Sequence, residues 1–149
     1  MNWILFGFKG VGKTTFGRKL AKSLNRTFID TDQIIEEASG LSPRDFTLQN
    51  GVEAFRGEES RVIENLWGDR LIISVGGGSV LRPKNVEKLL ELGHMIHLTC
   101  PVMTLKQRLF KPPYPTFLDP NDLERSFEKI YEQRIQIYEK IASFALLNI

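Results

Sequence analysis

The sequence has few of the features that mark a secreted, membrane-bound or nucleic-acid-binding protein. Cys100 is the single cysteine among 149 residues, so no internal disulfide can form and the usual paired spacings of zinc ligands are missing. No apolar run reaches the roughly 18 residues of a membrane-spanning helix, and no basic segment precedes the first apolar stretch. Lysine and arginine are spread along the chain, which gives a net charge of +2 without a block of like charge. We therefore expect a cytosolic protein that binds neither membranes nor nucleic acids.

What is present fits a small α/β enzyme. With 149 residues, of which 42% are hydrophobic, the chain is long enough for one domain with a substantial core and too short for a second independent one. The slightly basic balance suits small anionic substrates. We expect a single domain over residues 1–149.

A phosphate-binding loop dominates the sequence. Residues 7–14 read Gly-Phe-Lys-Gly-Val-Gly-Lys-Thr and match the pattern G-x-x-x-x-G-K-[ST] at every fixed position. Glycines let the backbone turn its N–H groups toward a polyphosphate, and the helix that follows presents its positive dipole end. We expect Lys13 to bridge the outer phosphates as a catalytic residue and the Thr14 hydroxyl to bind Mg²⁺. The predicted nucleotide-binding residues of the loop are Gly10, Val11, Gly12, Lys13, Thr14 and Thr15.

The flanking segments support this interpretation. The apolar run 2–6 ends at the first glycine and predicts a buried strand, and residues 15–24 have the spacing of a helix with one apolar face. The alternative, a glycine-rich turn without a ligand, does not require a Lys-Thr pair that opens a helix.

Two carboxylates follow the next strand, predicted over residues 27–30. Asp30 and Asp32 stand at its carboxyl end, where open α/β sheets bind ligands. If the strand continued, both side chains would point the same way, so one would hold the water shell of a metal ion and the other would face an acceptor hydroxyl. The alternative is that Asp32 caps the next helix and Asp30 is merely solvated at the end of the strand.

Several later segments complete the predicted architecture. Ser42 is expected to cap a short helix over residues 44–49, and a longer helix is expected from Gly51 through Trp67. Arg56 on that helix reads, by itself, as half of a solvated ion pair. Three glycines, 76–78, follow the apolar strand 71–75 and allow a ligand to approach the backbone, although a flexible turn is the simpler explanation.

The remaining elements are a strand, two helices and a proline-rich loop. A helix over 84–92 leads to a strand over 94–99. Its two histidines are expected to face opposite sides, which argues against a metal site there. Residues 111–120 contain four prolines and predict a surface loop or a lid next to the helix that carries Arg108. A last helix over 122–141 and a strand over 144–149 end the sequence.

Taken together, these motifs resemble the shikimate kinases, P-loop enzymes of the nucleoside-monophosphate-kinase fold. The resemblance rests on the loop 7–14, on Phe-Ile-Asp-Thr-Asp at 28–32 followed by Ile35 and Glu36, on Phe-Arg-x-x-Glu at 55–59, on Gly-Gly-Gly at 76–78, and on Arg134 followed by Tyr138. It implies MgATP as the phosphoryl donor and shikimate, at its 3-hydroxyl, as the acceptor.

The resemblance also implies roles for individual residues. Asp30 helps to hold Mg²⁺ through water, Asp32 binds the ring hydroxyls and orients the acceptor, and Arg108 lies along the adenine. The shikimate carboxylate is bound by Arg56 and Arg134, and Gly77 meets the substrate through its backbone.

Three features depart from the family pattern. Members usually carry a lid arginine followed by Pro-Leu-Leu, whereas this sequence has Tyr-Pro-Thr-Phe at 114–117, which leaves Lys111 as the catalytic candidate and Arg108 as the alternative. Val52 stands where an acidic residue is common. Members also usually continue past the last strand through an adenine-contacting loop and a closing helix.

The expectation is therefore a three-layer α/β P-loop fold with a five-stranded parallel sheet, a helical substrate-binding region over about 32–66 and a lid over about 111–120. We expect a monomeric kinase. Kinases for gluconate or a nucleoside monophosphate are the rival enzymes, and a nucleotide-binding regulatory domain is the rival of another class. The combination of Asp32, Arg56 and Arg134 argues against the rival kinases and against the regulatory domain, since a nucleotide sensor needs no second anion site. A GTPase is disfavoured because no N-K-x-D tetrapeptide is present.

Overall fold

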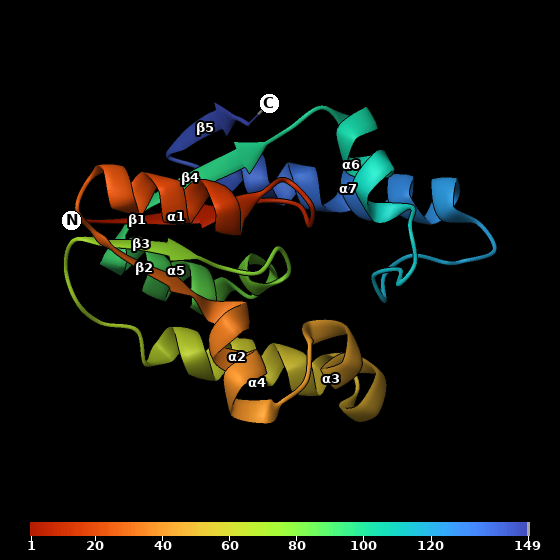
Figure 1. Ribbon diagram of the computed structural model, residues 1–149, viewed down its shortest axis with the longest axis horizontal. Coiled ribbons are helices and arrows are strands. Elements are labelled where there is room, and N and C mark those ends of the chain that lie inside the picture. The colour runs from red at the N-terminus through yellow and green to blue at the C-terminus, as the bar shows by residue number, and fades with distance from the viewer. Residues whose placement is uncertain (149) are drawn as a thin grey trace.

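The chain forms a five-stranded parallel sheet in the computed structural model, which describes residues 1–148. The strands lie in the order β2-β3-β1-β4-β5, and every neighbouring pair is parallel (Figure 1). Their bounds are β1 Asn2–Phe6, β2 Thr27–Asp30, β3 Leu71–Ser74, β4 Gly93–Thr99 and β5 Phe144–Leu147. The predicted sheet is confirmed, with the ends of β1 to β4 within one residue of those expected. Strand β5 ends at Leu147, and Ile149, the last residue of the strand expected over 144–149, lies outside the described residues.

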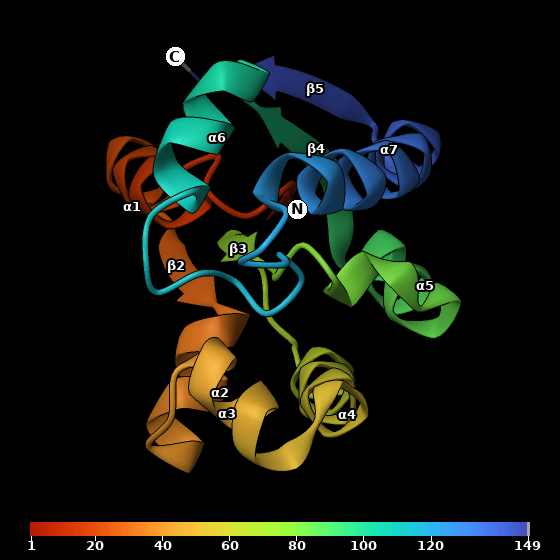
Figure 2. The ribbon, with the colours of Figure 1, turned by 90° about the vertical axis from the view of Figure 1, so that its right-hand side faces the viewer.

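Alternating side chains cover the two faces of the sheet. Ile4, Phe6 and Ile73 pack on the face that α5 and α7 cover, whereas Leu5 and Ile72 pack against α1 on the other face. Figure 2 shows α1 on one side of the sheet and α5 and α7 on the opposite side. Because the central strands are covered on both faces, they are apolar at almost every position, as expected of a buried parallel sheet.

The helices connect these strands and build the region beside the sheet. Helices α2, α3 and α4 form a group on the β2 side of the sheet (Figures 1 and 2), and α4 also contacts α5, since Ile63 of α4 and Leu89 of α5 share one core. The loop between α6 and α7 runs between this group and the rest of the protein (Figure 2). The bounds are α1 Lys13–Ser23, α2 Thr31–Ser39, α3 Pro43–Asn50, α4 Val52–Glu64, the 3₁₀ turn Ser79–Leu81, α5 Pro83–Leu92, α6 Val102–Leu109 and α7 Leu123–Ile141.

The structure corrects the expected end of α4 and excludes the alternative in which Asp32 caps α2. Helix α4 ends at Glu64, before the expected Trp67, and the Asn65 side chain donates to the carbonyl of Arg61 to close its last turn. Strand β2 ends at Asp30, as expected, but Asp30 rather than Asp32 is the N-cap of α2, and its carboxylate accepts hydrogen bonds from the backbone N–H groups of Asp32 and Gln33. Asp32 is therefore neither a strand residue nor the helix cap.

Among residues 1–148, no helix is both long and apolar enough to cross a bilayer.

Candidate active site

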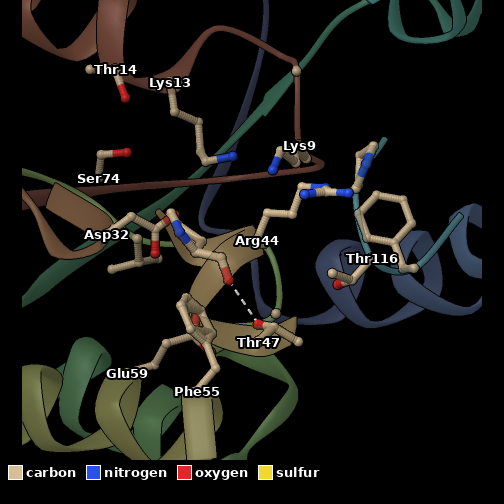
Figure 3. Close-up of a pocket in the computed structure, with 18 of the residues that line it drawn as sticks. Lys9, Lys13, Thr14, Asp32, Arg44, Thr47, Phe55, Glu59, Ser74 and Thr116 are labelled. Carbon is tan, nitrogen blue, oxygen red and sulfur yellow. Dashed lines mark hydrogen bonds between the residues drawn. The ribbon is translucent and has the colours of Figure 1, made fainter. Parts of the chain in front are cut away.

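One cavity of about 460 Å³ lies at the carboxyl ends of the central strands. Residues from distant parts of the chain line it: the phosphate loop, the segments after β2 and β3, the helices α3 and α4, the loop between α6 and α7, and one arginine each from α6 and α7. Figure 3 shows residues from these parts directed toward the same space. Ligands of open parallel sheets usually bind at this end of the strands, because the loops that follow neighbouring strands meet there.

The phosphate loop has the backbone that its glycines predict. Gly10 and Gly12 have φ values of 92° and 89°, in the left-handed region that a side chain disfavours, and α1 begins immediately after Gly12. Lys13 folds back across the loop, where its ammonium donates to the carbonyls of Gly7 and Phe8 at 3.0 and 3.3 Å. Burial lowers the pKa of Lys13 to about 8, although Asp32 and Asp30 oppose this shift. A phosphate in the loop would replace the two carbonyls and raise the pKa again, because a nearby anion favours the charged ammonium.

The two residues expected at the metal ion lie in contact. The Thr14 hydroxyl donates to Oδ2 of Asp30 at 2.8 Å, and both residues line the cavity. Oxygen donors of this kind suit Mg²⁺, which takes one or two protein ligands together with water and phosphate oxygens. Within residues 1–148, no group of three histidine, cysteine, aspartate or glutamate side chains is arranged to hold a metal ion alone. The residues present therefore fit a Mg²⁺ ion that arrives with the nucleotide.

Asp32 presents an unsatisfied carboxylate to the cavity. Oδ1 is fully buried and has no hydrogen-bond partner among residues 1–148, although part of the residue is exposed. Burial raises the pKa of Asp32 to about 6, helped by the neighbouring charges of Glu59 and Asp30. A buried acceptor without a partner is costly to keep, which points to a ligand hydroxyl as the missing donor.

Arg56 is not a solvated surface residue. Its Nη1 donates to Oε1 of Glu59 at 2.5 Å, and Oε2 of the same carboxylate accepts from the Ser79 hydroxyl at 2.8 Å. The Glu59 side chain is 2% exposed and that of Arg56 is 19% exposed. A buried glutamate fixed at both oxygens therefore holds the Arg56 guanidinium at the edge of the cavity.

Each of the three glycines after β3 has its own steric reason. A Cβ on Gly76 would lie 2.7 Å from Oε2 of Glu59 and 2.9 Å from Oδ1 of Asp32. A Cβ on Gly77 would lie 2.8 Å from the carbonyl oxygen of Gly7, and one on Gly78 would overlap the guanidinium of Arg56. The flexible-turn explanation is therefore wrong, because the glycines let charged side chains and the phosphate loop approach this backbone closely.

Arg134 enters the cavity from α7 and is 8% exposed. Its guanidinium lies over the rings of Phe8 and Phe117 at 5.7 and 5.1 Å, and burial lowers its pKa. One turn later the Tyr138 hydroxyl donates to the carbonyl of Gly77 at 2.6 Å. The structure thus brings Arg56, Gly77 and Arg134 to one cavity from three separate segments of the chain.

The predicted lid contributes Pro115, Thr116 and Phe117 to the cavity lining. Lys111 is exposed and is not among the lining residues, whereas Arg108 lines the cavity and donates from Nη1 to the carbonyl of Gly10. The structure therefore places Arg108 at the phosphate loop and Lys111 on the outer surface.

Comparisons with known proteins agree with this geometry. A family model described as shikimate kinase matches residues 9–148. The shikimate kinase of Streptococcus gordonii is 40% identical over 147 residues, which span 96% of this chain and 88% of the relative. The shikimate kinase of Pelotomaculum thermopropionicum is 37% identical over 139 residues, which span 93% of this chain and 81% of the relative. The chain belongs to the shikimate kinase family.

Solved structures of the family have the same fold. The Acinetobacter baumannii shikimate kinase in complex with shikimate gives a TM-score of 0.90 at 30% identity and covers 97% of this chain and 82% of that one. The shikimate kinase of Aquifex aeolicus gives a TM-score of 0.83 at 27% identity and covers 99% of this chain and 87% of that one. As a member of the shikimate kinase family, the chain is an ATP-dependent kinase, and its α/β P-loop fold is confirmed.

Some residues that line the cavity were not predicted from the sequence. Lys9 and Thr47 line it without a predicted role, as does Arg44, which comes from the first turn of α3. Glu59 carried a usable signal, since it is a glutamate on the apolar face of α4, between the buried Phe55 and Val62. Arg44 carried none, because an arginine near a helix start looks like any solvated surface residue.

Proposed function

We propose that the protein transfers the γ-phosphoryl group of MgATP to the 3-hydroxyl of shikimate, which yields ADP and shikimate 3-phosphate for aromatic amino-acid biosynthesis. The observation that supports this most is one cavity lined by a phosphate loop and by two arginines, Arg56 and Arg134, with the unsatisfied Asp32 carboxylate on its wall. A donor phosphate and an anionic polyol acceptor can be held there together, and phosphoryl transfer depends mainly on such positioning and on charge neutralisation.

The donor end of the cavity is proposed to hold the nucleotide. Backbone N–H groups of residues 10–15 and the Lys13 ammonium would bind the β- and γ-phosphates, and Arg108 would lie along the adenine. Thr14 would bind Mg²⁺ directly and Asp30 would bind it through water. When bound, the ion neutralises charge on the phosphate oxygens.

The acceptor end is proposed to hold shikimate. Arg56 and Arg134 would bind the carboxylate, since two guanidinium groups match its charge and its planar shape. The Asp32 carboxylate would accept hydrogen bonds from ring hydroxyls, and the Gly77 backbone would contact the ring. With its pKa near 6, Asp32 is ionised at neutral pH and can take the proton of the attacking hydroxyl.

The domain is proposed to divide the work as the sequence predicts. Residues 32–66 supply acceptor contacts, residues 111–120 act as a lid that excludes water, and the rest of the single domain holds the nucleotide. Lys111 would enter the site only if lid closure turned it inward, because it is exposed outside the cavity here. We further propose that the protein is cytosolic and monomeric. Light scattering of the purified protein would test the monomeric state.

A coupled assay of ADP formation tests the proposal. We expect ADP release from MgATP to depend on shikimate, with little release on addition of gluconate or a nucleoside monophosphate. Phosphorus NMR of the product would give a coupling to the ring proton at position 3. Equal ADP release without an acceptor, or a preference for gluconate or a nucleotide, would contradict the proposed function.

A further inference from the structure

The lid side of the cavity has no charge of its own. Pro115, Thr116 and Phe117 are the lid residues that line it, and the lid's one basic residue, Lys111, is exposed and does not line the cavity. Phosphoryl transfer spreads negative charge over three equatorial oxygens, so the side of the phosphate that faces the lid also needs a positive group.

Arg44 brings a guanidinium to this place from a different part of the chain. It stands in the first turn of α3, lines the cavity, and donates from Nε to the Tyr114 carbonyl at 3.0 Å, across 70 positions of sequence. Tyr114 immediately precedes the three lid residues of the cavity wall. Figure 3 shows Arg44 directed into the same space as Lys9 and Lys13 of the phosphate loop. One side chain therefore joins the acceptor-binding helices to the lid.

The position of Arg44 does not stabilise α3. A positive charge in the first turn opposes the helix dipole, which favours anions at that end. Its ion pair with Asp45 is long, 3.5 Å, and both side chains are more than one-third exposed, so it contributes little. The local energetics thus give no reason for an arginine here, whereas its cavity contacts do.

The Arg44 guanidinium also keeps N–H groups available for a ligand. Within residues 1–148, Arg56 is engaged by Glu59, Arg108 by the Gly10 carbonyl and Lys13 by the phosphate-loop carbonyls. The hydrogen bonds of Arg44 use Nε and Nη1 and leave Nη2 without a partner in that part of the chain.

We propose that Arg44 supplies the positive charge on the lid side of the phosphoryl group, and that its bond to the Tyr114 carbonyl holds the lid in place while it does so. Nη1 and Nη2 then bind oxygens of the transferring phosphoryl group and of the phosphorylated product, and Arg44 gains or loses no proton. The proposal rests on the function proposed above and adds to it a residue that touches the reacting group.

The test compares four variants with the wild type. Arg44→Met removes the charge and keeps the length, Arg44→Lys keeps the charge without Nε, and Lys111→Met removes the lid lysine. Arg125→Met is the matched control, because Arg125 also stands in the first turn of a helix near an aspartate, but 89% exposed and outside the cavity. Steady-state kinetics with MgATP and shikimate would be combined with calorimetric binding of shikimate and of shikimate 3-phosphate, and with melting temperatures.

We expect Arg44→Met to lower kcat by at least about tenfold, with KM values for ATP and shikimate within about twofold, as for a group that acts on the transition state. It should also lose affinity for shikimate 3-phosphate but not for shikimate. Arg44→Lys should recover part of kcat, and Arg125→Met should match the wild type. Unchanged melting temperatures would exclude a folding defect.

Three results would overturn the role of Arg44. One is an unchanged kcat in Arg44→Met, whether or not Lys111→Met loses activity. Another is a loss of kcat with undiminished affinity for shikimate 3-phosphate, which would leave Arg44 a positioning residue for the lid. The third, absence of shikimate-dependent ADP formation in the wild type, would reject the proposed function and this role with it, whereas the first two leave the proposed function standing.

Discussion

Replacing Asp32 by asparagine is expected to stabilise the ligand-free protein while it removes the activity. The carboxylate is enclosed, and burial, Glu59 and Asp30 together raise its pKa from 3.8 to about 6. An amide has nearly the same shape and no charge, so the free-energy cost of an ionised group at this place disappears. The repulsion between this carboxylate and that of Glu59 disappears as well.

The size of the gain follows from linkage between protonation and folding. A pKa about two units higher in the folded than in the unfolded protein costs about 3 kcal/mol of unfolding free energy at pH 7.5. Between about pH 4 and pH 6 the folded protein keeps the proton that the unfolded chain releases, so the free energy of unfolding falls as the pH rises through this window. About half of the cost is present at pH 5 and little of it below pH 4.

Urea unfolding followed by circular dichroism measures this effect. Asp32→Asn should raise the free energy of unfolding by about 3 kcal/mol at pH 7.5 and by about half as much at pH 5. Glu132→Gln, which neutralises an exposed carboxylate on α7, is the control and should show little change at either pH. In Asp32→Asn, kcat should also fall about 100-fold or more, since the acceptor hydroxyl loses its base. In the wild type, kcat/KM should fall as the pH drops below about 6.

Two results would refute this reasoning about Asp32. If the variant were less stable than the wild type at pH 7.5, the carboxylate would be contributing favourable contacts that outweigh its burial. If the gain were the same at pH 5 and pH 7.5, ionisation of Asp32 would not be its cause.

Three further predictions concern the two ends of the cavity. Lys13→Ala should lower kcat by about 100-fold or more with an unchanged circular dichroism spectrum, because the ammonium neutralises phosphate charge and adds little to the core; near-normal turnover would reject the phosphate-loop role. Arg56→Lys or Arg134→Lys should raise the KM for shikimate by about tenfold or more and leave that for ATP nearly unchanged, since an ammonium cannot replace a bidentate fork; equal effects on both substrates would indicate a structural role. Gly78→Ala should likewise raise the KM for shikimate, because the new Cβ displaces the Arg56 guanidinium, and the double variant with Arg56→Lys should then show less than additive losses.

Local sequence determined the donor end of the site. The phosphate loop is a continuous run in which each glycine has a backbone reason and Lys13 and Thr14 open a helix, so its structure follows from neighbouring residues alone. Hydrophobic pattern likewise determined the parallel sheet, because strands covered on both faces must be apolar throughout. The loop depends on interactions between residues close in the chain, and the burial of each strand is visible in its own composition, although the strands that pair lie far apart in sequence.

Tertiary structure decided what the acceptor end is made of. Arg56 reads as a surface ion pair until the fold buries Glu59 beneath it, and Asp32 becomes an unsatisfied acid only because Asp30 takes the cap of α2 and turns the chain. Arg44 donates to the carbonyl of Tyr114 in the lid, 70 positions away, and no local sequence pattern predicts this hydrogen bond. Charges acquire their roles from burial and from partners that the fold brings together, whereas the phosphate loop carries its partners in its own backbone.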